Sequence, residues 1–246
     1  NGGTRAKLNQ SDLKEILVPL PPLPEQQKIA SILTSVDEVI EKTQSQINKL
    51  QDLKKGTMNE LLTKGIGHTE FKDSPVGKIP VGWEVKKLSD LVSVDRESLK
   101  NSTDPDYEFY YIDIASVRTG VIDKPSNKIK FYGSPSRAKR VVRQNDVLIS
   151  TVRPNLKAFA YVKDEFVDCI CSTGFSVLRV NEYNDGRFIF NSILSDGVTK
   201  QIDALVAGSN YPAINSSDVK ELSIVRPPLP EQQKIASILT SVDKVI

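Results

Sequence analysis

The chain has 246 residues, of which 39% are hydrophobic and 26% charged, and its formal net charge is +2. This length is enough to bury a substantial core in one or two domains. We find no long apolar run, no signal-peptide pattern and no lipidation motif, so the sequence predicts a cytoplasmic protein that does not span a membrane. The first residue is Asn1 and the last residues fall inside an apolar helical pattern, which suggests a fragment.

The first predicted element is a short strand at residues 16–18, where three apolar residues are consecutive. The prolines that follow cannot continue a helix or a central strand. Pro24 suits the first turn of a new helix, and Glu25 lies at the positive end of that helix.

A long helix is predicted over residues 25–62, with Gly65 as its C-terminal stop. Apolar positions spaced alternately by four and three are typical of a coiled coil. The positions of this stripe are Ile29, Leu33, Val36, Ile40, Thr43, Ile47 and Leu50. One such stripe needs a partner helix, although a helix lying on its own domain remains an alternative.

Residues 65–226 predict a globular α+β domain with a mixed sheet. Strands are expected at 108–117, 146–152, 159–162, 169–180 and 221–226. Short helices are expected at 88–94, 187–194 and 198–206. The expected architecture is therefore one mixed-sheet domain attached to a long coiled-coil helix.

A repeat with an offset of 206 residues is the strongest signal in the sequence. The segment PPLPEQQKIASILTSVD at 21–37 recurs unchanged at 227–243, and 24 of 33 positions are identical between 8–40 and 214–246. This period is too long for a solenoid. It indicates a unit of one domain plus one connector that is used at least twice.

Positive charge is concentrated in residues 124–157, which carry nine Lys or Arg residues against one Asp, a net +8. Such a local field is typical of phosphate binding. The plainer alternative is a solvated, lysine-rich loop. Because Asn, Ser, Gln and aromatic residues are interspersed there, we favour contact with nucleic acid.

The sequence contains no recognisable catalytic constellation. His68 is the only histidine, and we find neither a phosphate-binding glycine loop nor an amino-methyltransferase motif. Cys169 and Cys171 alternate as in a strand, which favours buried packing over a disulfide or metal site. A Mg²⁺ site at Asp104, Asp106, Glu108 and Asp113 is the weaker interpretation of these acidic residues. We expect no enzyme activity, no cofactor and no metal.

Four motifs resemble the specificity (S) subunits of type I restriction-modification systems. The proline segment followed by the long helix to LLTKGIG resembles their conserved-region helix. IPVGWEVKKLSDL (79–91) looks like the opening of a target recognition domain, GSNYPAINSSDVKEL (208–222) like its closing, and NDVLIST (145–151) like an internal strand. The chain is thus identified as a fragment or half-subunit with one recognition domain.

The resemblance implies two recognition domains, each reading half of a split double-stranded DNA site, held apart by antiparallel helices. Methyltransferase subunits dock on the helices, and the nuclease subunit joins through the complex. Residues 1–24 then close a preceding recognition domain, 25–64 form the conserved helix, 65–226 the recognition domain, and 227–246 the start of a second helix. A homodimer of half-subunits is a further arrangement. Arg5-Ala6 replaces Tyr211-Pro212 in the first copy, which fits different half-sites.

Candidate DNA-binding residues combine positive charge, amide groups or aromatic rings with loop positions. They are Lys130, Arg137, Lys139, Arg140, Arg153, Asn155, Lys157, Asn210 and Tyr211. The candidate partner-binding helix residues are Ile29, Leu33, Val36, Ile40, Ile47 and Leu50. The rival hypotheses are a free-standing DNA-binding regulator dimerised by its coiled coil, a catalytic enzyme and a pure scaffold.

Overall fold

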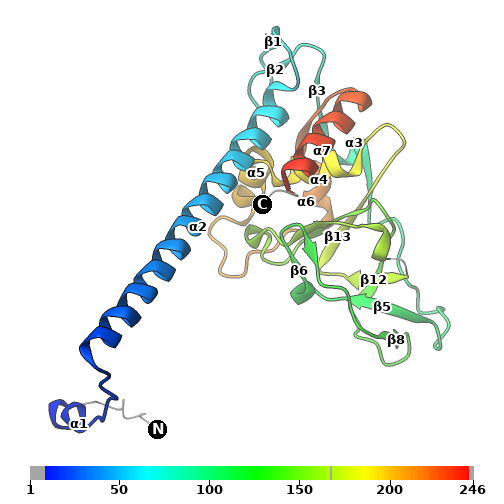
Figure 1. Cartoon of the computed structure of the whole chain (residues 1–246). Helices are drawn as coiled ribbons and strands as arrows, with labels where there is room; N and C mark the ends of the chain where they lie inside the picture. Colours follow the sequence, from blue (N-terminus) through cyan, green and yellow to red (C-terminus); the bar gives the residue numbers. More distant parts are fainter. Residues whose placement is uncertain (1–8, 167, 244–246) are drawn as a thin grey trace. The chain divides into compact units, whose positions relative to one another are not determined.

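The computed structural model describes residues 9–166 and 168–243 (Figure 1). The Arg5-Ala6 difference and the last three residues of the repeated helix lie outside the described residues. The chain divides into two compact units, one ending at Leu50 and the other beginning at Gln51.

The first unit is helical. It holds α1 (Gln10–Lys14) and most of α2 (Leu23–Lys64). The helix α2 confirms the predicted long helix and begins two residues earlier than expected. Asn9 and Asp12 form a reciprocal capping box at the start of α1. Apart from Leu62, no residue of α2 is fully buried.

The second unit contains two four-stranded sheets (Figure 1). The first is antiparallel throughout, in the order β11 (Phe159–Tyr161), β10 (Val147–Ser150), β13 (Phe175–Val180) and β4 (Val92–Val94). The second has the order β8 (Lys128–Lys130), β5 (Glu108–Ile112), β12 (Cys169–Ser172) and β9 (Ala138–Val141). Because β5 and β12 are parallel, this second sheet is mixed, and the α+β prediction is confirmed.

Short pairs and helices complete the unit. The pairs are β1 (Phe71–Lys72) with β2 (Ile79–Pro80), β3 (Glu84–Lys87) with β14 (Ser223–Arg226), and β6 (Val117–Arg118) with β7 (Val121–Ile122). The helices are α3 (Leu88–Leu91), α4 (Gly186–Leu194), α5 (Asp196–Val206), α6 (Ser216–Glu221) and α7 (Leu229–Asp243). Single 3-10 turns are η1 (Ile114–Ser116), η2 (Pro154–Leu156) and η3 (Asp164–Phe166).

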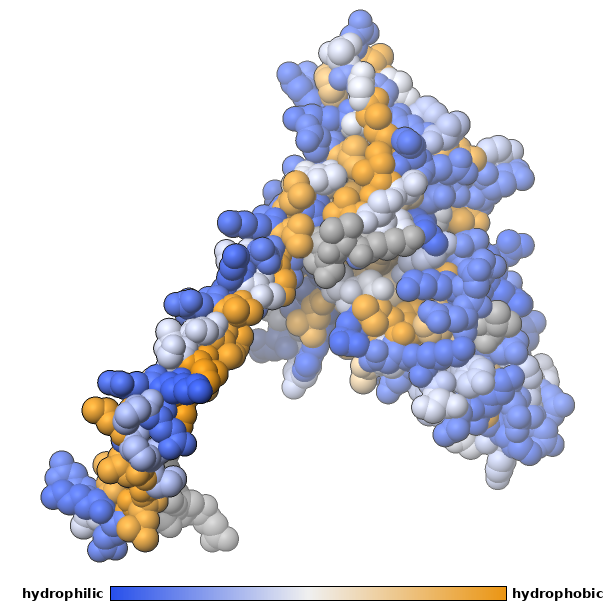
Figure 2. Space-filling model, viewed as in Figure 1, coloured by the Kyte–Doolittle hydropathy of each residue, from blue (hydrophilic) through white to orange (hydrophobic). Residues whose placement is uncertain are grey.

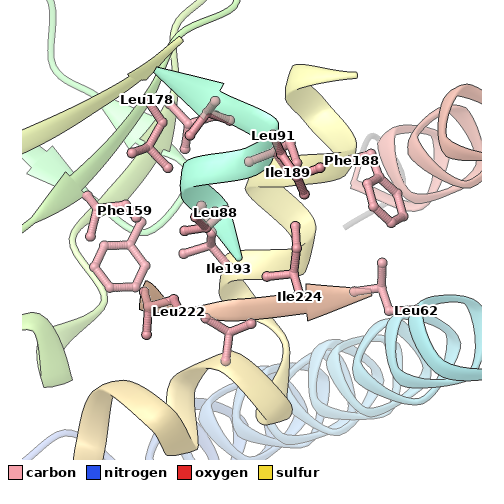
Figure 3. Packing of buried hydrophobic residues seen from close by; sticks show 14 of the residues in the cluster. Leu62, Leu88, Leu91, Phe159, Leu178, Phe188, Ile189, Ile193, Leu222 and Ile224 are labelled. Atoms are coloured by element: carbon pink, nitrogen blue, oxygen red, sulfur yellow. The ribbon is translucent and has the colours of Figure 1, made fainter. Parts of the chain in front are cut away.

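The core is layered on both faces of the first sheet. Val147 and Ile149 of β10 join the larger cluster, which the helices cover, whereas Leu148 joins a second cluster with Cys169 and Cys171 of the other sheet. All four residues of β10 are buried because both of its faces are covered. Figure 3 shows Leu178, Phe159, Leu88 and Ile193 converging between the sheet and α4.

Several boundaries differ from the sequence predictions. The stretch 88–94 divides into α3 and β4, because β-branched Val92 and Val94 join the ladder with β13. The stretch 108–117 divides at η1, and 169–180 divides at Thr173-Gly174, where the chain passes from the second sheet to the first. The short helix α6 was not expected.

The strand predicted at 16–18 is wrong. Its copy β14 exists because β3 supplies a ladder of backbone partners, whereas residues 16–18 have none among the described residues. Ile16, Leu17 and Val18 are 55%, 97% and 77% exposed, but Leu222 and Ile224, the copies of Ile16 and Val18, are only 2% and 3% exposed. Local sequence alone therefore does not make this strand.

Hydrogen exchange should separate the two copies. We expect fast amide exchange at 13–18, where the backbone lacks a packed partner, and slow exchange at 219–225, where α6 and β14 are packed into the core. Mass spectrometry of peptides from the monomeric chain measures both segments in one experiment. Equal strong protection of both segments would contradict the prediction.

Candidate nucleic-acid interface

Four of the nine cations in residues 124–157 are paired with carboxylates from outside that stretch. The pairs are Lys128–Asp168 at 3.4 Å, Lys130–Asp106 at 2.8 Å, Arg140–Asp95 at 3.1 Å and Arg143–Glu97 at 3.0 Å. The field predicted from the sequence is therefore weaker in the folded unit. Within the described ranges, no carboxylate lies in ion-pairing range of Lys124, Arg137, Lys139, Arg153 or Lys157.

Lys139 and Arg140 are neighbours on β9, at the point where the register of its pairing with β12 shifts. Lys139 Nζ lies 4.6 Å from the centroid of the Phe131 ring. Arg140 donates to Asp95, and only 23% of its side chain is exposed. The structure thus separates Lys139 from Arg140 and gives the guanidinium of Arg140 an internal partner.

Asp95 explains why Arg140 turns inward. Its carboxylate accepts from the backbone N–H of Val177 at 2.8 Å and from the Ser216 hydroxyl at 2.5 Å. Together with Arg140, these bonds tie the end of β4 to β13, β9 and the start of α6. Asp95 itself adopts a positive φ of 56°.

Backbone hydrogen bonds join four loops in a row. Thr173 N–H donates to Arg137 O at 2.8 Å, and Thr151 N–H donates to Gly174 O at 2.8 Å. Ile214 N–H then donates to Thr151 O at 2.9 Å, and Arg153 N–H to Pro212 O at 2.8 Å. We call residues 151–158 and 209–214 the paired loops. The Thr173-Gly174 turn links Arg137 to the paired loops.

The paired loops hold their backbone in an unusual conformation. Arg153 and Lys157 flank η2 and both adopt the left-handed region, with φ of 49° and 52°. Non-glycine residues visit this region rarely, and such strain concentrates at functional sites. Pro154 between them is buried and fixes the turn, which leaves Arg153 and Asn155 exposed.

Arg153 and Tyr211 line one cavity of about 580 Å³, although they are 58 positions apart in the sequence. Tyr211 is 84% exposed and Leu156 is 64% exposed. We call this hollow the paired-loop cavity. A forked guanidinium beside exposed aromatic and aliphatic side chains suits the edges and methyl groups of bases.

The other predicted residues fall into two groups. Asn155, Lys157 and Asn210 belong to the paired loops, and Lys157 O accepts a bond from Thr119 Oγ1 at 2.8 Å. Lys130 is on β8, at the opposite edge of the second sheet from β9. The structure therefore brings Arg137, Arg153, Asn155, Lys157, Asn210 and Tyr211 together and leaves Lys130 apart.

Sequence reasoning missed Arg118 and Thr119, which also line the paired-loop cavity. Thr119-Gly120 carries a turn signal, and the residues do form the β6–β7 turn. No pattern in the sequence indicates that this turn lies beside residues 151–158. Arg118 pairs with Asp123 at 2.8 Å.

A buried ion network supports the start of β10. Arg179 donates to both carboxylate oxygens of Asp146, at 3.0 and 2.9 Å, and also to Glu97. Burial raises the pKa of Asp146, and Arg179 opposes that shift. A hydrogen bond from Arg143 lowers the pKa of Glu97. The network holds in place the strand from which the paired loops emerge.

The helix surface predicted to bind a partner is exposed. Figure 2 shows hydrophobic residues along one side of α2. Ile29, Leu33, Val36 and Ile40 are 43%, 58%, 49% and 59% exposed, Ile47 is 37% exposed, and Leu50 is half-buried. The stripe is thus uncovered over most of its length.

Neither cysteine has the environment of a nucleophile. Both are buried in β12, and burial raises the pKa of Cys169 to about 11 and that of Cys171 well above its usual value. His68 Nε2 lies 2.7 Å from Glu231 Oε1, and the Trp83 indole donates to Glu231 Oε2 at 2.9 Å. Among the described residues, no three His, Cys, Asp or Glu side chains gather as a metal site.

Across residues 9–166 and 168–243, no helix is long and apolar enough to cross a membrane.

Solved structures share this fold. The S (HsdS) subunit from Thermoanaerobacter tengcongensis is 32% identical with a TM-score of 0.58, covering 68% of this chain and 43% of that chain. The type I restriction-modification S subunit from M. genitalium, at 16% identity, matches the fold with a TM-score of 0.55 over 96% of this chain and 59% of that one. The fold is that of restriction-modification S subunits.

Sequence comparison defines the family. The model of the type I restriction modification DNA specificity domain matches residues 1–52 and 80–246, and the chain belongs to this family. The putative type I restriction enzyme MjaX specificity subunit of Methanocaldococcus jannaschii is 31% identical over 252 residues, covering 98% of this chain. That alignment covers 56% of the relative, so the chain spans about half the length of the curated relatives it matches.

Proposed function

We propose that the chain recognises one half of a bipartite double-stranded DNA site, as the specificity subunit of a type I restriction-modification complex. The observation that carries this proposal is the paired-loop cavity. Two separate loops, fixed to each other by backbone bonds, present Arg153 and Tyr211 to one hollow on an exposed surface. Membership of the DNA specificity domain family supports the same function.

Within this proposal the residues have two kinds of role. Arg153, Asn155, Asn210 and Tyr211 contact base edges, because guanidinium and amide groups pair bidentately with guanine and adenine. Arg137, Lys139 and Lys157 contact phosphates, which position the protein but carry no sequence information. Lys130 and Arg140 contribute less, because each is already bound to a carboxylate.

The chain supplies recognition and no catalysis. Both thiols are held in the protonated form by burial, and the single imidazole is engaged with Glu231. We expect a purified preparation incubated with DNA, Mg²⁺ and S-adenosylmethionine neither to cut nor to methylate the DNA.

The exposed stripe of α2 docks the methyltransferase subunits, through which the nuclease subunit joins. Burying its large aliphatic side chains would remove apolar surface from water, which favours association. The 17 residues at 21–37 recur at 227–243, and four residues of α7 within this copy are buried by the recognition domain. The same sequence is thus able to bind a protein surface.

Selection from random-sequence duplexes tests the reading role. The parent chain should enrich one half-site motif. Arg153→Ala should lose the base preference at one or two positions of that motif, because each lost bidentate contact removes about 1–3 kcal/mol of discrimination between bases. Tyr211→Ala should relax a neighbouring position. High-throughput sequencing of the bound fraction measures the preferences.

Arg137→Ala is the matched control, since loss of a phosphate contact should weaken binding of all sequences uniformly and keep the motif. If Arg153→Ala and Tyr211→Ala both enrich the same motif as the parent chain, the residues of the paired-loop cavity do not read bases.

A further inference from the structure

A second cavity lies beside the β6–β7 turn. Its volume is about 520 Å³, and it is bounded by the turn, by β11 and α4, by Lys54 of α2 and by the last turn of α7. Thr119 lines both this hollow and the paired-loop cavity. We call it the α4–α7 cavity. All of its lining residues belong to the unit that begins at Gln51.

The charge of the α4–α7 cavity is positive. It contains Lys54, Lys163 and Arg187, with Asp243 as the one carboxylate among its lining residues. Asp243 is neutralised by Lys54 at 2.6 Å. Lys163 and Arg187 are exposed, and within residues 9–166 and 168–243 neither has a carboxylate in ion-pairing range. Two cations therefore remain available for an anionic ligand.

The fold positions Arg187 at this cavity. Its guanidinium carbon lies 5.2 Å from the centroid of the Tyr161 ring, and Tyr161 donates its hydroxyl to Asn145. Gly186 permits the close approach of α4, since a Cβ there would lie 2.6 Å from Asn145 O. A guanidinium in contact with a ring uses none of its N–H groups as hydrogen-bond donors to other polar atoms in that contact, so they remain available to a ligand.

We propose that Lys163 and Arg187 bind a backbone phosphate of the DNA strand that passes the paired loops. This inference rests on the proposed function and extends the DNA-contacting surface to the α4–α7 cavity. Thr119 connects the two cavities, so a strand read at Arg153 continues beside the basic pair. A phosphodiester fits better than a protein carboxylate, because backbone contacts flanking the bases fix the register of reading.

Salt titration of the full chain with a random-sequence duplex tests the site. Lys163→Ala with Arg187→Ala should reduce the slope of log affinity against log salt by about 0.9, because one phosphate contact is lost. At about 0.15 M salt the affinity should fall roughly 5-fold, as calculated from the same slope. Duplexes with and without the selected half-site motif should lose affinity by the same factor.

Two further variants sharpen the result. Lys72→Ala with Lys220→Ala removes the same charge from exposed positions outside both cavities and should change the slope less. Arg187→Lys keeps the charge at the cavity, and together with parental Lys163 it should retain most of the slope.

Three outcomes would overturn the inference. An unchanged slope would exclude a phosphate, and a changed half-site motif would mean that the pair reads bases. Parental DNA binding with lost retention of methyltransferase subunits would show that the cavity takes a protein carboxylate. A parent chain that binds no duplex would instead overturn the proposed function, and this inference with it.

Discussion

Leu239→Ala is expected to lower the free energy of unfolding of the recognition unit by about 2–5 kcal/mol, the usual cost of truncating a buried leucine. Leu33→Ala, inside the same 17-residue sequence, should change it by less than about 0.5 kcal/mol. The reason is packing alone, because Leu239 is 3% exposed and Leu33 is 58% exposed. Urea denaturation of the two variants measures the difference, and equal losses would contradict it.

The exposed copy also tests the docking proposal. Leu33→Asp with Ile40→Asp should abolish retention by methyltransferase subunits while the urea midpoint of the recognition unit stays unchanged. Normal retention would show that this stripe is not the docking surface. If the parent chain forms a dimer without any partner and the double variant is monomeric, the free-standing regulator is favoured instead.

Arg179→Ala is expected to cost about 3–5 kcal/mol, because it leaves the carboxylate of Asp146 buried without its bidentate partner. The side chain of Asp146 is 1% exposed and that of Arg179 is 18% exposed. Lys130→Ala, which breaks the exposed pair with Asp106, should fall within about 0.5 kcal/mol of the parent. Thermal or urea unfolding provides the comparison.

The loss in Arg179→Ala should depend on pH. Burial already raises the pKa of Asp146, and Arg179 opposes this rise, so its removal raises the pKa further. A carboxyl group with a raised folded-state pKa destabilises the fold as the pH increases above its unfolded pKa, because only the unfolded chain then ionises freely. The variant should therefore lose more stability at neutral pH than at acidic pH. Adding Asp146→Asn should recover part of the loss, and no recovery would contradict an ion-pair origin.

The candidate site was only partly predictable. Charge, amide groups and turn signals predict Arg153, Asn155 and Tyr211 as site residues, but nothing in the sequence shows that residues 151–158 and 209–214 pair. Arg140 was predicted at the DNA because it lies in a run of cations. Asp95, which binds it, comes from a distant segment, and charges counted along a chain omit such partners. Lys163, which we propose as a phosphate-binding residue, gives no charge signal in the sequence, because Asp164 and Glu165 follow it.

The repeat shows what the sequence by itself determined. Asn9 with Asp12 and Asn215 with Asp218 form the same capping box, because a cap involves only neighbouring residues. Gln26 Nε2 donates to Pro21 O at 2.7 Å, and its copy Gln232 donates to Pro227 O at 2.9 Å. Both copies of the proline segment lead into a helix. These features recur wherever the sequence recurs.

Burial and pairing were decided by the tertiary structure. Gln232 also accepts a bond from Asp185 N–H at 2.9 Å, and Ile235 is completely buried, whereas the matching Ile29 is 43% exposed. Likewise β14 is a strand beside β3, and residues 16–18 are not. Helix caps are satisfied within a few residues of chain, but a strand needs a neighbouring ladder and an apolar side chain needs a packed surface. Identical residues therefore adopt the same local turns and helices and still differ in what they bury.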